Sequence, residues 1–274
     1  MIDLTRVDPR LYDDITLIVD ELQASVGLDP DSVLVVGAGC RDILHAAFGH
    51  TFPLRATTDT DLGIAVHDWT ISERIDVRFR RIGSNGIRYS IAGIPVDIMP
   101  FGEVEDPDGI THPAARRGSR GLRVPRRLRA FPRLTLPNRM SVRLPQPAGY
   151  AALKMRSWID RAMYGHDKDA KDLALAAFWY QEAPEIQERL YDTDAGFDIL
   201  TTLDLDIDLA ATRLLGIDAA EQLSPANRAD LARRWAQQDL DVLARDFTLP
   251  ATSSRAADIA CRRDLVAQFL LPRG

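Results

Sequence analysis

The chain has 274 residues, of which 46% are hydrophobic and 27% charged, and its formal net charge is −6 at pH 7. This composition is typical of a soluble globular protein. Two isolated cysteines, Cys40 and Cys261, argue against a cysteine zinc site, and they favour a reducing compartment over a disulfide framework. No run approaches the roughly 20 apolar residues of a membrane span, and the N-terminus lacks the apolar region of a signal peptide. We therefore expect a cytoplasmic protein that contacts no membrane.

The first half of the chain predicts helices alternating with strands. Apolar residues recur at helical spacing over residues 10–26, which predicts an amphipathic helix. A strand-like run over 32–36 leads into a tight turn at Gly37-Ala38-Gly39 and then into a helix that begins with CRDILHAAF. The next predicted elements are a strand over 59–67, a helix over 68–80, and a hairpin of strands 87–91 and 94–99 around Ala92-Gly93.

The second half is predicted to be helical after a proline-rich connection. Residues 102–147 contain seven prolines, which indicate a long, irregular, basic connection with room for short strands. The helices expected beyond it cover 148–164, 167–181, 184–191, 206–215, 224–246 and 255–270. Ser224 followed by Pro225 is a usual helix start. The expected architecture is α+β: an N-terminal domain with a mixed sheet over 1–145, including the basic connection at about 110–145, and a C-terminal helical domain over 146–274.

The charge is unevenly distributed along the chain. Between Gly109 and Ile159 there is no Asp or Glu, whereas twelve Lys and Arg residues occur there, ten of them arginines between Arg116 and Arg143. The rest of the chain holds 22 basic and 40 acidic residues. Such asymmetry indicates that one surface meets a polyanion. The alternative is that these arginines pair with the surplus acids of the chain or with an acidic partner.

Three aspartates carry the prediction of a catalytic site. Asp59 and Asp61 lie two apart at the start of a predicted strand, so their side chains share one face. Asp97 lies inside the apolar segment IPVDIMPF, where a charge is costly unless it is paired or bound to a metal. If the two strands are neighbours, the carboxylates converge, and Mg²⁺ or Mn²⁺ prefers such oxygen ligands. This set suits phosphoryl transfer assisted by two metal ions, whereas solvated, inert aspartates are the alternative.

The glycine turn before the first of these acids can hold phosphate, because backbone N–H groups at a helix N-terminus bind anions. Gly37 and Gly39 also begin a Rossmann-like pattern, with Asp59 about 20 residues further on. Asp42 occupies the place of the third small residue of that pattern, and Asp59 begins a strand rather than ending one. We therefore favour a phosphate-binding turn over a dinucleotide fold. A third interpretation is that the glycines serve only a sharp turn.

These segments together resemble the nucleotidyltransferases of the AbiEii family, which are toxins of abortive-infection toxin–antitoxin systems and have the polymerase-β-like nucleotidyltransferase fold. The resemblance depends on the segments VLVVGAGCRD, TTDTDLGIAV, VDIMPFGEVEDPDG, LKMRSWIDR and HDKDAKDLALA. They span about residues 33–175, and the residues beyond carry no matching motif. The resemblance implies that the α+β half is a polymerase-β-like domain and that the helical half belongs to the same enzyme.

The resemblance also implies a role for individual residues. Asp59 and Asp61 take the place of the paired metal ligands, Asp97 that of the third carboxylate, and Lys154 that of the nucleotide-phosphate lysine. The residues expected to be catalytic are Asp59, Asp61, Asp97, Lys154, Asp169 and Asp172, and those expected to bind the nucleotide are Gly37, Ala38, Gly39, Arg41, Thr58, Lys154 and Lys168. Two departures are a Gly-Ala turn in place of Gly-Ser or Gly-Gly, and a spacing of 21 positions from Ala38 to Asp59. Backbone N–H groups alone would therefore hold the phosphate.

In the helical half, residue spacing predicts which side chains share a helical face. Lys154 and Trp158 share one helical face, so the lysine stem can pack on the ring while its head reaches a phosphate. Asp169 and Asp172 share a face as well, and Asp169 can accept a bond from Lys154 or from a nucleotide. The alternatives are a solvated lysine and helix-surface carboxylates without a role.

The expected function is transfer of a nucleoside monophosphate from a nucleoside triphosphate to an RNA acceptor, with release of pyrophosphate, by the toxin of an AbiE-like system. In the arginine-rich segment over 115–143, Phe131 is the only aromatic residue, which favours backbone recognition of a folded RNA over base stacking. The family's association with the tRNA acceptor end makes tRNA the expected acceptor, and an antitoxin protein is an expected partner. Two alternatives stay open: transfer to a small molecule such as an antibiotic, and a catalytically inactive nucleotide- or protein-binding module.

Overall fold

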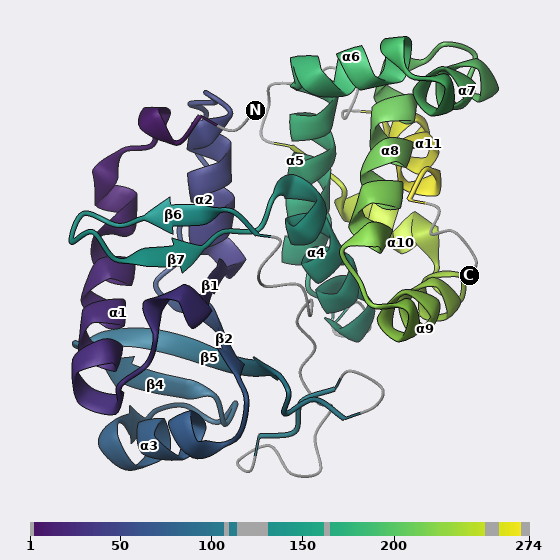
Figure 1. Ribbon diagram of the computed structural model, residues 1–274. Coiled ribbons are helices and arrows are strands. Elements are labelled where there is room, and N and C mark those ends of the chain that lie inside the picture. The colour runs from purple at the N-terminus through teal and green to yellow at the C-terminus, as the bar shows by residue number, and fades with distance from the viewer. Residues whose placement is uncertain (1–2, 107–109, 114–130, 162–164, 250–257, 270–274) are drawn as a thin grey trace. The chain divides into compact units, whose positions relative to one another are not determined.

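The computed structural model describes residues 3–106, 110–113, 131–161, 165–249 and 258–269 (Figure 1). Within these residues the chain has eleven α-helices and one seven-stranded mixed sheet, so the predicted α+β class is confirmed. The chain divides into two compact units. We call Asp3–Gly49 with Arg55–Gln146 the sheet unit, and the described residues of His50–Leu54 and Pro147–Gly274 the helical unit. Every helix of the described residues is too short or too polar to cross a lipid bilayer.

The sheet unit arranges its strands in the order β3-β4-β5-β2-β1-β7-β6. The strands are β1 (Val33–Val36), β2 (Thr60–Val66), β3 (Arg80–Arg81), β4 (Arg88–Ile91), β5 (Ile94–Gly102), β6 (Arg133–Thr135) and β7 (Ser141–Arg143). β2 runs parallel to β5, β1 runs parallel to β7, and the other neighbours are antiparallel. The four strands predicted between residues 32 and 99 are thus present as β1, β2, β4 and β5, and the proline-rich connection adds β6 and β7.

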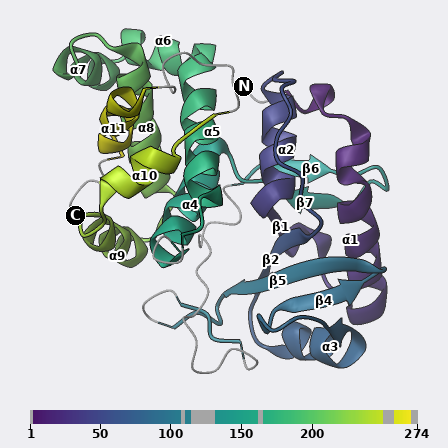
Figure 2. The same cartoon turned by 180° about the vertical axis from the view of Figure 1, so that it is seen from behind.

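The helices of the sheet unit pack on one face of the sheet (Figure 1 and Figure 2). They are α1 (Asp13–Val26), α2 (Gly37–Ala47) and α3 (Thr70–Arg78), with the 3₁₀ helices η1 (Leu4–Arg6), η2 (Pro9–Tyr12) and η3 (Pro30–Ser32). A Cβ at Gly39 of α2 would lie 3.5 Å from Val35 Cγ1 and 3.9 Å from Ile15 Cδ1 of α1. On α3, the buried Ile75 lines the same cavity as Ile98. These helices therefore bury the face of the sheet that carries Val35 and Ile98.

The strand register puts the predicted carboxylates on the other face. Asp61 is the partner of Val36 on β1 and of Asp97 on β5. Side chains alternate along a strand, and register partners point the same way. Asp61 and Asp97 therefore lie on the face opposite to the one that α1, α2 and α3 bury, with Asp61 beside the first residue of α2, whereas Val35 and Ile98 point toward these helices.

Two boundaries in the sheet unit can be compared with the predictions. Gly37 is the first residue of α2 rather than part of a separate turn, because its φ of +61° lets the chain pass directly from β1 into the helix. The hairpin at Ala92-Gly93 is confirmed. Both residues have positive φ, 50° and 80°, which is the type I′ geometry that matches the twist of a two-residue hairpin.

The helical unit is built around α4, α5 and α8, which pack against one another. Its helices are α4 (Pro147–Arg161), α5 (Lys168–Glu182), α6 (Pro184–Asp192), α7 (Asp194–Thr202), α8 (Ile207–Glu221), α9 (Pro225–Trp235), α10 (Leu240–Asp246) and α11 (Ile259–Ala267). The rings of Tyr150 and Trp179, 5.7 Å apart, join α4 to α5 in this core. Apolar side chains of these three helices thus form the core of this unit.

Two helices of this unit were predicted wrongly. The single helix expected over 224–246 is interrupted before α10, because the Asp239 carboxylate accepts the Asp241 N–H at 3.0 Å and caps a new helix. The short helix α7 was not predicted, although Thr193 is its N-cap and accepts the Gly196 N–H at 3.0 Å. The start of α9 is as predicted, since the Ser224 hydroxyl accepts the Asn227 N–H and Pro225 follows it.

Candidate active site

Asp61 and Asp97 are adjacent on the face of the sheet opposite to the one that α1, α2 and α3 bury. They are register partners on the parallel strands β2 and β5, and neighbouring strands lie about 4.8 Å apart. Asp59 lies one residue before β2 and shares a cation with Asp97. The Asp59 and Asp97 side chains are 28% and 12% exposed, so solvent and solutes can reach them. The structure thus places Asp61 beside Asp97 on neighbouring strands and connects Asp59 to Asp97 through Arg88.

Arg88 joins two of these carboxylates. Its Nε donates to Asp97 Oδ1 at 2.6 Å, and its Nη2 donates to Asp97 Oδ2 at 3.0 Å and to Asp59 Oδ2. The Asn85 side-chain amide also donates to both Asp97 oxygens, at 3.1 Å each. Charge-assisted, two-pronged contacts of this kind are stronger than neutral hydrogen bonds. The charge of Asp97, which lies within an apolar strand, is therefore compensated by Arg88 and Asn85 of the same unit.

Neither Arg88 nor Asn85 was predicted from the sequence, but the hairpin contains the signal. A two-residue loop at Ala92-Gly93 pairs Ile91 with Ile94, and counting outward pairs Arg88 with Asp97. The loop before β4 then holds Asn85, whose Oδ1 accepts the Ile87 and Arg88 N–H groups at 3.1 and 3.0 Å. Turn type and loop length together determine which residue faces Asp97.

The surroundings of Asp59 and Arg88 favour the charged form of each side chain. Burial acts to raise the pKa of Asp59, but the Thr57 hydroxyl, which donates to Oδ1 at 2.7 Å, and the Arg88 guanidinium outweigh it, so this pKa lies below its usual value. The hydrogen bonds with Asp97 hold the pKa of Arg88 above its usual value. At neutral pH Asp59 is therefore an anion and Arg88 a cation.

Gly37 lets α2 begin directly beside Asp61. A Cβ added at Gly37 would lie 2.7 Å from both Cβ and Cγ of Asp61, and its φ is +61°. Glycine is needed here both for the backbone conformation and for the close approach. The N-cap residue Val36 makes no side-chain hydrogen bond. The partly positive N-terminus of α2 thus lies beside a carboxylate, and an anion placed there could use the first backbone N–H groups of the helix.

The other residues predicted to bind a nucleotide in this unit lie in varied surroundings. Ala38 is buried, and Gly39 packs with its Cα toward the core. Arg41 is also buried, and it donates to Asp42 Oδ1 at 2.8 Å and to the Arg55 carbonyl at 2.7 Å. Thr58 is exposed. A role for Arg41 at a nucleotide would require it to leave partners that it already has, whereas Thr58 is accessible.

The predicted lysine and acids of the helical half form a buried ion cluster within the helical unit. Lys154 Nζ on α4 lies 2.6 Å from Asp172 Oδ2 and 3.6 Å from Asp169 Oδ1, both on α5. Arg161 Nη2 lies 2.9 Å from Asp169 Oδ2. The Lys154 Nζ also lies 5.2 Å from the centroid of the Tyr150 ring, within the range of a cation–π contact.

Two alternatives considered for these residues are wrong. Lys154 is not a solvated cation, and Asp169 and Asp172 are not surface carboxylates, because all three are buried. They escape solvent because α5 packs against α4 and α8 on two sides. Lys168, the first residue of α5, is exposed. The cluster joins α4 to α5, and its predicted contact with a nucleotide stays a prediction.

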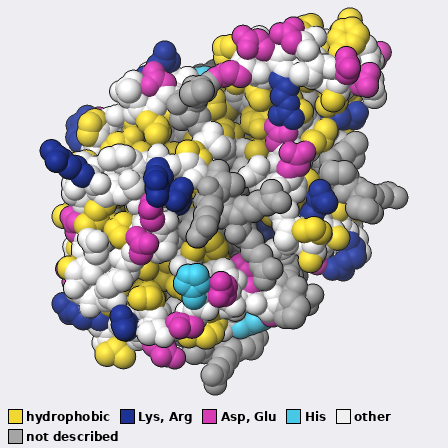
Figure 3. Space-filling model, in the orientation of Figure 1, with side chains coloured by type: hydrophobic (Ala, Val, Ile, Leu, Met, Phe, Trp, Pro, Cys, Tyr) yellow, Lys and Arg dark blue, Asp and Glu magenta, His cyan; other side chains and the backbone are white. Residues whose placement is uncertain are grey.

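Most of the arginine-rich segment over 115–143 lies outside the described residues, which omit 114–130. Two arginines of its described part face an acid of the same unit. Arg133 Nη2 lies 2.6 Å and Arg143 Nη2 3.8 Å from the Asp31 carboxylate. On the face drawn in Figure 3, the Lys and Arg side chains of the described residues are interspersed with Asp and Glu. For Arg133 and Arg143, internal pairing is thus the observed arrangement.

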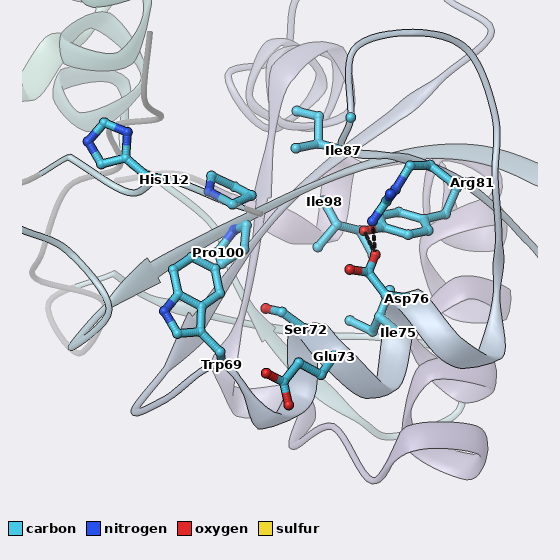
Figure 4. Close-up of a pocket in the computed structure, with 13 residues that line it drawn as sticks. Trp69, Ser72, Glu73, Ile75, Asp76, Arg81, Ile87, Ile98, Pro100 and His112 are labelled. Atoms are coloured by element: carbon cyan, nitrogen blue, oxygen red, sulfur yellow. Dashed lines mark hydrogen bonds and ion pairs between the residues drawn. The ribbon is translucent and has the colours of Figure 1, made fainter. Parts of the chain in front are cut away.

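A cavity of about 210 Å³ lies on the other face of the sheet (Figure 4). Ile98 and Pro100 of β5 line it together with Trp69 and Ser72 near α3. In its lining, the Tyr89 hydroxyl donates to Asp76 Oδ1 at 2.5 Å, and burial with this bond raises the pKa of Tyr89 to about 12. Since Ile98 and Asp97 are consecutive on β5, the sheet separates this cavity from the carboxylates.

The three carboxylates suit a hard divalent cation by their chemistry. Within the described residues, however, no group of three or more His, Cys, Asp and Glu side chains is arranged to hold a metal ion. Asp59 and Asp97 instead share the charge of Arg88. Comparison of the chain with protein-family models, with curated proteins and with solved structures finds no match.

Proposed function

We propose that this protein is a metal-dependent nucleotidyltransferase that transfers a nucleoside monophosphate from a nucleoside triphosphate to RNA. The observation that carries the proposal is that Asp61 lies beside Asp97 on neighbouring strands and beside the glycine that begins α2, while Asp59 shares Arg88 with Asp97. Paired carboxylates next to a helix N-terminus suit phosphoryl transfer, because the carboxylates can hold cations and the helix N–H groups can orient phosphate.

The arrangement of the sheet unit supports a polymerase-β-like fold for this half. β1 passes through Gly37 into α2, and β2 then returns antiparallel to β1 with Asp59 and Asp61 at its start. β5 lies parallel to β2 and contributes Asp97. A strand, a glycine-started helix and a returning strand with two acids are also the segments on which the resemblance to the AbiEii family depends.

The proposed reaction is an in-line displacement at the α-phosphorus. Asp59, Asp61 and Asp97 would hold Mg²⁺ or Mn²⁺, and the N–H groups at the start of α2 would orient the triphosphate. A bound ion would supply Lewis-acid stabilisation of the phosphate charge and would acidify the attacking hydroxyl. The acceptor oxygen forms a new bond to the α-phosphorus as the bond to the β-phosphate oxygen breaks. Pyrophosphate leaves, and the hydroxyl proton passes to a carboxylate of this group.

The acceptor and the biological role follow from the same resemblance and from the charge distribution. The acid-free, arginine-rich stretch supports a polyanionic acceptor, for which we propose RNA, with tRNA as the first candidate. Action as the toxin of an AbiE-like toxin–antitoxin pair, with an antitoxin as protein partner, is part of the same proposal.

The test is an RNA-labelling assay with each of the four α-labelled nucleoside triphosphates, Mg²⁺ and total RNA. We expect one triphosphate to label RNA with the unaltered protein, and Asp59→Ala to abolish the label. Glu188→Ala is the matched control, because it removes the same charge from an exposed position on α6 and should retain labelling. Absence of any label, or equal labelling by Asp59→Ala, would refute the proposal.

The contact of Arg88 with two of the acids gives the inactive-module alternative a specific basis. In that case Arg88 would act only as the structural counter-ion of Asp59 and Asp97. This alternative predicts that Asp59→Ala leaves the protein's cellular effect unchanged, whereas the enzyme proposal predicts that the effect is lost together with RNA labelling.

A further inference from the structure

We propose that the cavity between α3 and the sheet is a binding site for a small organic cation, a primary or methylated amine with an apolar body about the size of one ring. The cavity lies in the sheet unit, on the face of the sheet that carries Ile98 (Figure 4). Asp97 precedes Ile98 on β5 and points to the opposite face. The inference is therefore independent of the proposed nucleotidyl transfer.

The first observation is the size of the cavity, which is about 210 Å³. An engineered protein cavity of about 150 Å³ accommodates benzene, so this cavity has room for one ring and a short substituent. Sites for larger ligands usually measure about 300–1,000 Å³. The size therefore favours a small molecule over a nucleotide.

The second observation is a wall of apolar side chains held by regular elements. Ile75 of α3, Ile87 just before β4 and Ile98 of β5 line the cavity and are buried. Pro100 of β5 lines it as well. An apolar body can therefore leave water on contact with side chains that are already in place, which favours binding without rearrangement.

The third observation is an aromatic ring, supplied by Trp69 just before α3. The ring lies on the side of the cavity away from Arg81 and Asp76 (Figure 4). Tryptophan attracts a cation over its ring face more strongly than the other aromatic side chains. In the part of the chain that the structure describes, the cations over aromatic rings are at other positions, so the Trp69 ring is not already used in this way.

Most charged groups along the cavity are balanced within the protein. Arg81 pairs with Asp76, and the Tyr89 hydroxyl donates to the same carboxylate. His112 Nε2 lies 3.3 Å from Asp106 Oδ2. A ligand anion would have to compete with Asp76 for the guanidinium of Arg81, which disfavours an anionic ligand.

Glu73 is the exception among these charges. It lines the cavity from an exposed position on α3, and within the described residues its carboxylate has no ion pair or hydrogen bond. With Arg81 and Asp76 paired, Glu73 leaves the lining with one surplus negative charge when His112 is neutral. Electrostatic complementarity then favours a ligand that carries one positive charge.

The ring and the free carboxylate lie on the same side of one helical turn. Trp69 and Glu73 are four residues apart, and the Glu73 backbone N–H donates to the Trp69 carbonyl at 2.9 Å. A ligand ammonium can therefore contact both groups while its apolar body covers Ile98 and Pro100. Each polar contact alone is weak at a partly exposed site, so the two together would give the preference for a cation.

The test is a nuclear magnetic resonance titration of the full ¹⁵N-labelled chain with three probes of similar shape: 2-phenylethylamine, a cation; 2-phenylethanol, which is neutral; and phenylacetate, an anion. The readout is the indole N–H signal of Trp69, which is identified by its loss in Trp69→Phe. We expect the amine to shift this signal saturably, the alcohol to bind about 5-fold more weakly, and the anion to leave the signal in place. The indole signals of Trp158, Trp179 and Trp235 in the helical unit should not move.

Glu73→Gln tests the carboxylate, because it keeps the shape of the side chain and removes its charge. This variant should bind the amine about 5-fold more weakly, the upper end of what a partly exposed ion pair contributes, and should bind the alcohol as before. Glu188→Gln is the matched control, since it removes the same charge from an exposed position on α6, and it should bind all three probes like the unaltered protein.

Three results would overturn the inference: no saturable shift of the Trp69 signal with the amine, equal affinities for the amine and the alcohol, or an affinity for the amine that Glu73→Gln leaves unchanged. RNA labelling has no part in this experiment, so a failure here leaves the proposed function standing, and a failure of the labelling assay leaves this site standing.

Discussion

Gly37, the first residue of α2, lies directly against the side chain of Asp61 on β2. A Cβ at Gly37 would approach Cβ and Cγ of Asp61 to 2.7 Å. The approach is possible because Val36 and Asp61 are register partners, so the chain leaves β1 beside the acid. This contact connects the backbone that would orient phosphate with a carboxylate that would hold metal.

Gly37→Ala should therefore destabilise the sheet unit more than an ordinary glycine replacement. The left-handed conformation alone costs about 1–2 kcal/mol for a residue with a Cβ, and overpacking adds about 1–3 kcal/mol. Gly93→Ala is the matched control, since Gly93 has a φ of +80° but nothing within 4 Å of its added Cβ. Hydrogen exchange of peptides from β1 and β2 during denaturant titration measures both variants. Equal losses of stability would show that the contact with Asp61 is unimportant.

The sequence was sufficient to predict the carboxylates but not their counter-ion. Period-two alternation in β2 and β5 put Asp61 and Asp97 each on a definite face, and a single assumption, that the strands are neighbours, brought them together. The contact of Arg88 with Asp97 follows from the hairpin loop length. Its contact with Asp59 does not, because it depends on the pairing of β2 with β5, which no local pattern encodes.

The burial of Asp169 and Asp172 shows a second limit of the sequence. Their spacing correctly puts them on one side of α5, and a helix with polar residues on one side is usually expected to face solvent there. In the structure that side faces Lys154 of α4. Packing of α5 against both α4 and α8 is a long-range property, so the helical pattern alone could not distinguish a solvated face from a paired one.

Lys154→Met should destabilise the helical unit by about 3 kcal/mol, because it leaves buried carboxylates without their cation. Removing one partner of a buried ion pair costs about 3–5 kcal/mol. We expect a loss at the lower end of this range because Arg161 still pairs with Asp169. Lys171→Met is the matched control: Lys171 pairs with Asp167 at an exposed i,i+4 position, where such pairs contribute about 0.3–0.5 kcal/mol. Urea unfolding of both variants gives the comparison.

Adding Asp172→Asn to Lys154→Met provides an internal check on that explanation. Removal of the unpaired charge should restore part of the lost stability, so the two substitutions should be non-additive. Additive losses would indicate that Lys154 stabilises the helical unit by packing rather than by its charge.

His50 should make the helical unit less stable in mild acid. Its ring lies 4.8 Å from that of Phe178 and 6.1 Å from that of Phe52, and this burial lowers its pKa, which Glu182 only partly opposes. A folded pKa below the unfolded value of about 6.5 means that the unfolded chain binds more protons. The contribution of neutral His50 is therefore fully present above about pH 6.5 and declines as the pH falls toward the folded pKa.

The measurement is the unfolding free energy from about pH 5 to pH 8 for the unaltered protein and for His50→Gln, which cannot titrate there. The difference between the two proteins should become less favourable to the unaltered protein as the pH falls. A difference that is constant over this range would show that His50 does not change its protonation on unfolding.

Asp31 offers a way to decide between internal pairing and RNA binding for the described arginines of the basic segment. It accepts from Arg133 Nε at 3.1 Å and Nη2 at 2.6 Å, and Arg143 lies nearby. If RNA competes for these arginines, Asp31→Asn should tighten RNA binding and steepen its salt dependence, since each additional phosphate contact changes the slope of log K against log salt by about 0.7–0.9. The control is Asp241→Asn, because Asp241 accepts from Arg263 through the same two nitrogens, at 2.7 and 3.2 Å, in the helical unit.

Fluorescence anisotropy with labelled tRNA at several salt concentrations measures both variants. Equal slopes for the two variants would show that Arg133 and Arg143 serve the fold rather than the acceptor, whereas a steeper slope for Asp31→Asn alone would place the RNA surface beside η3 and β6.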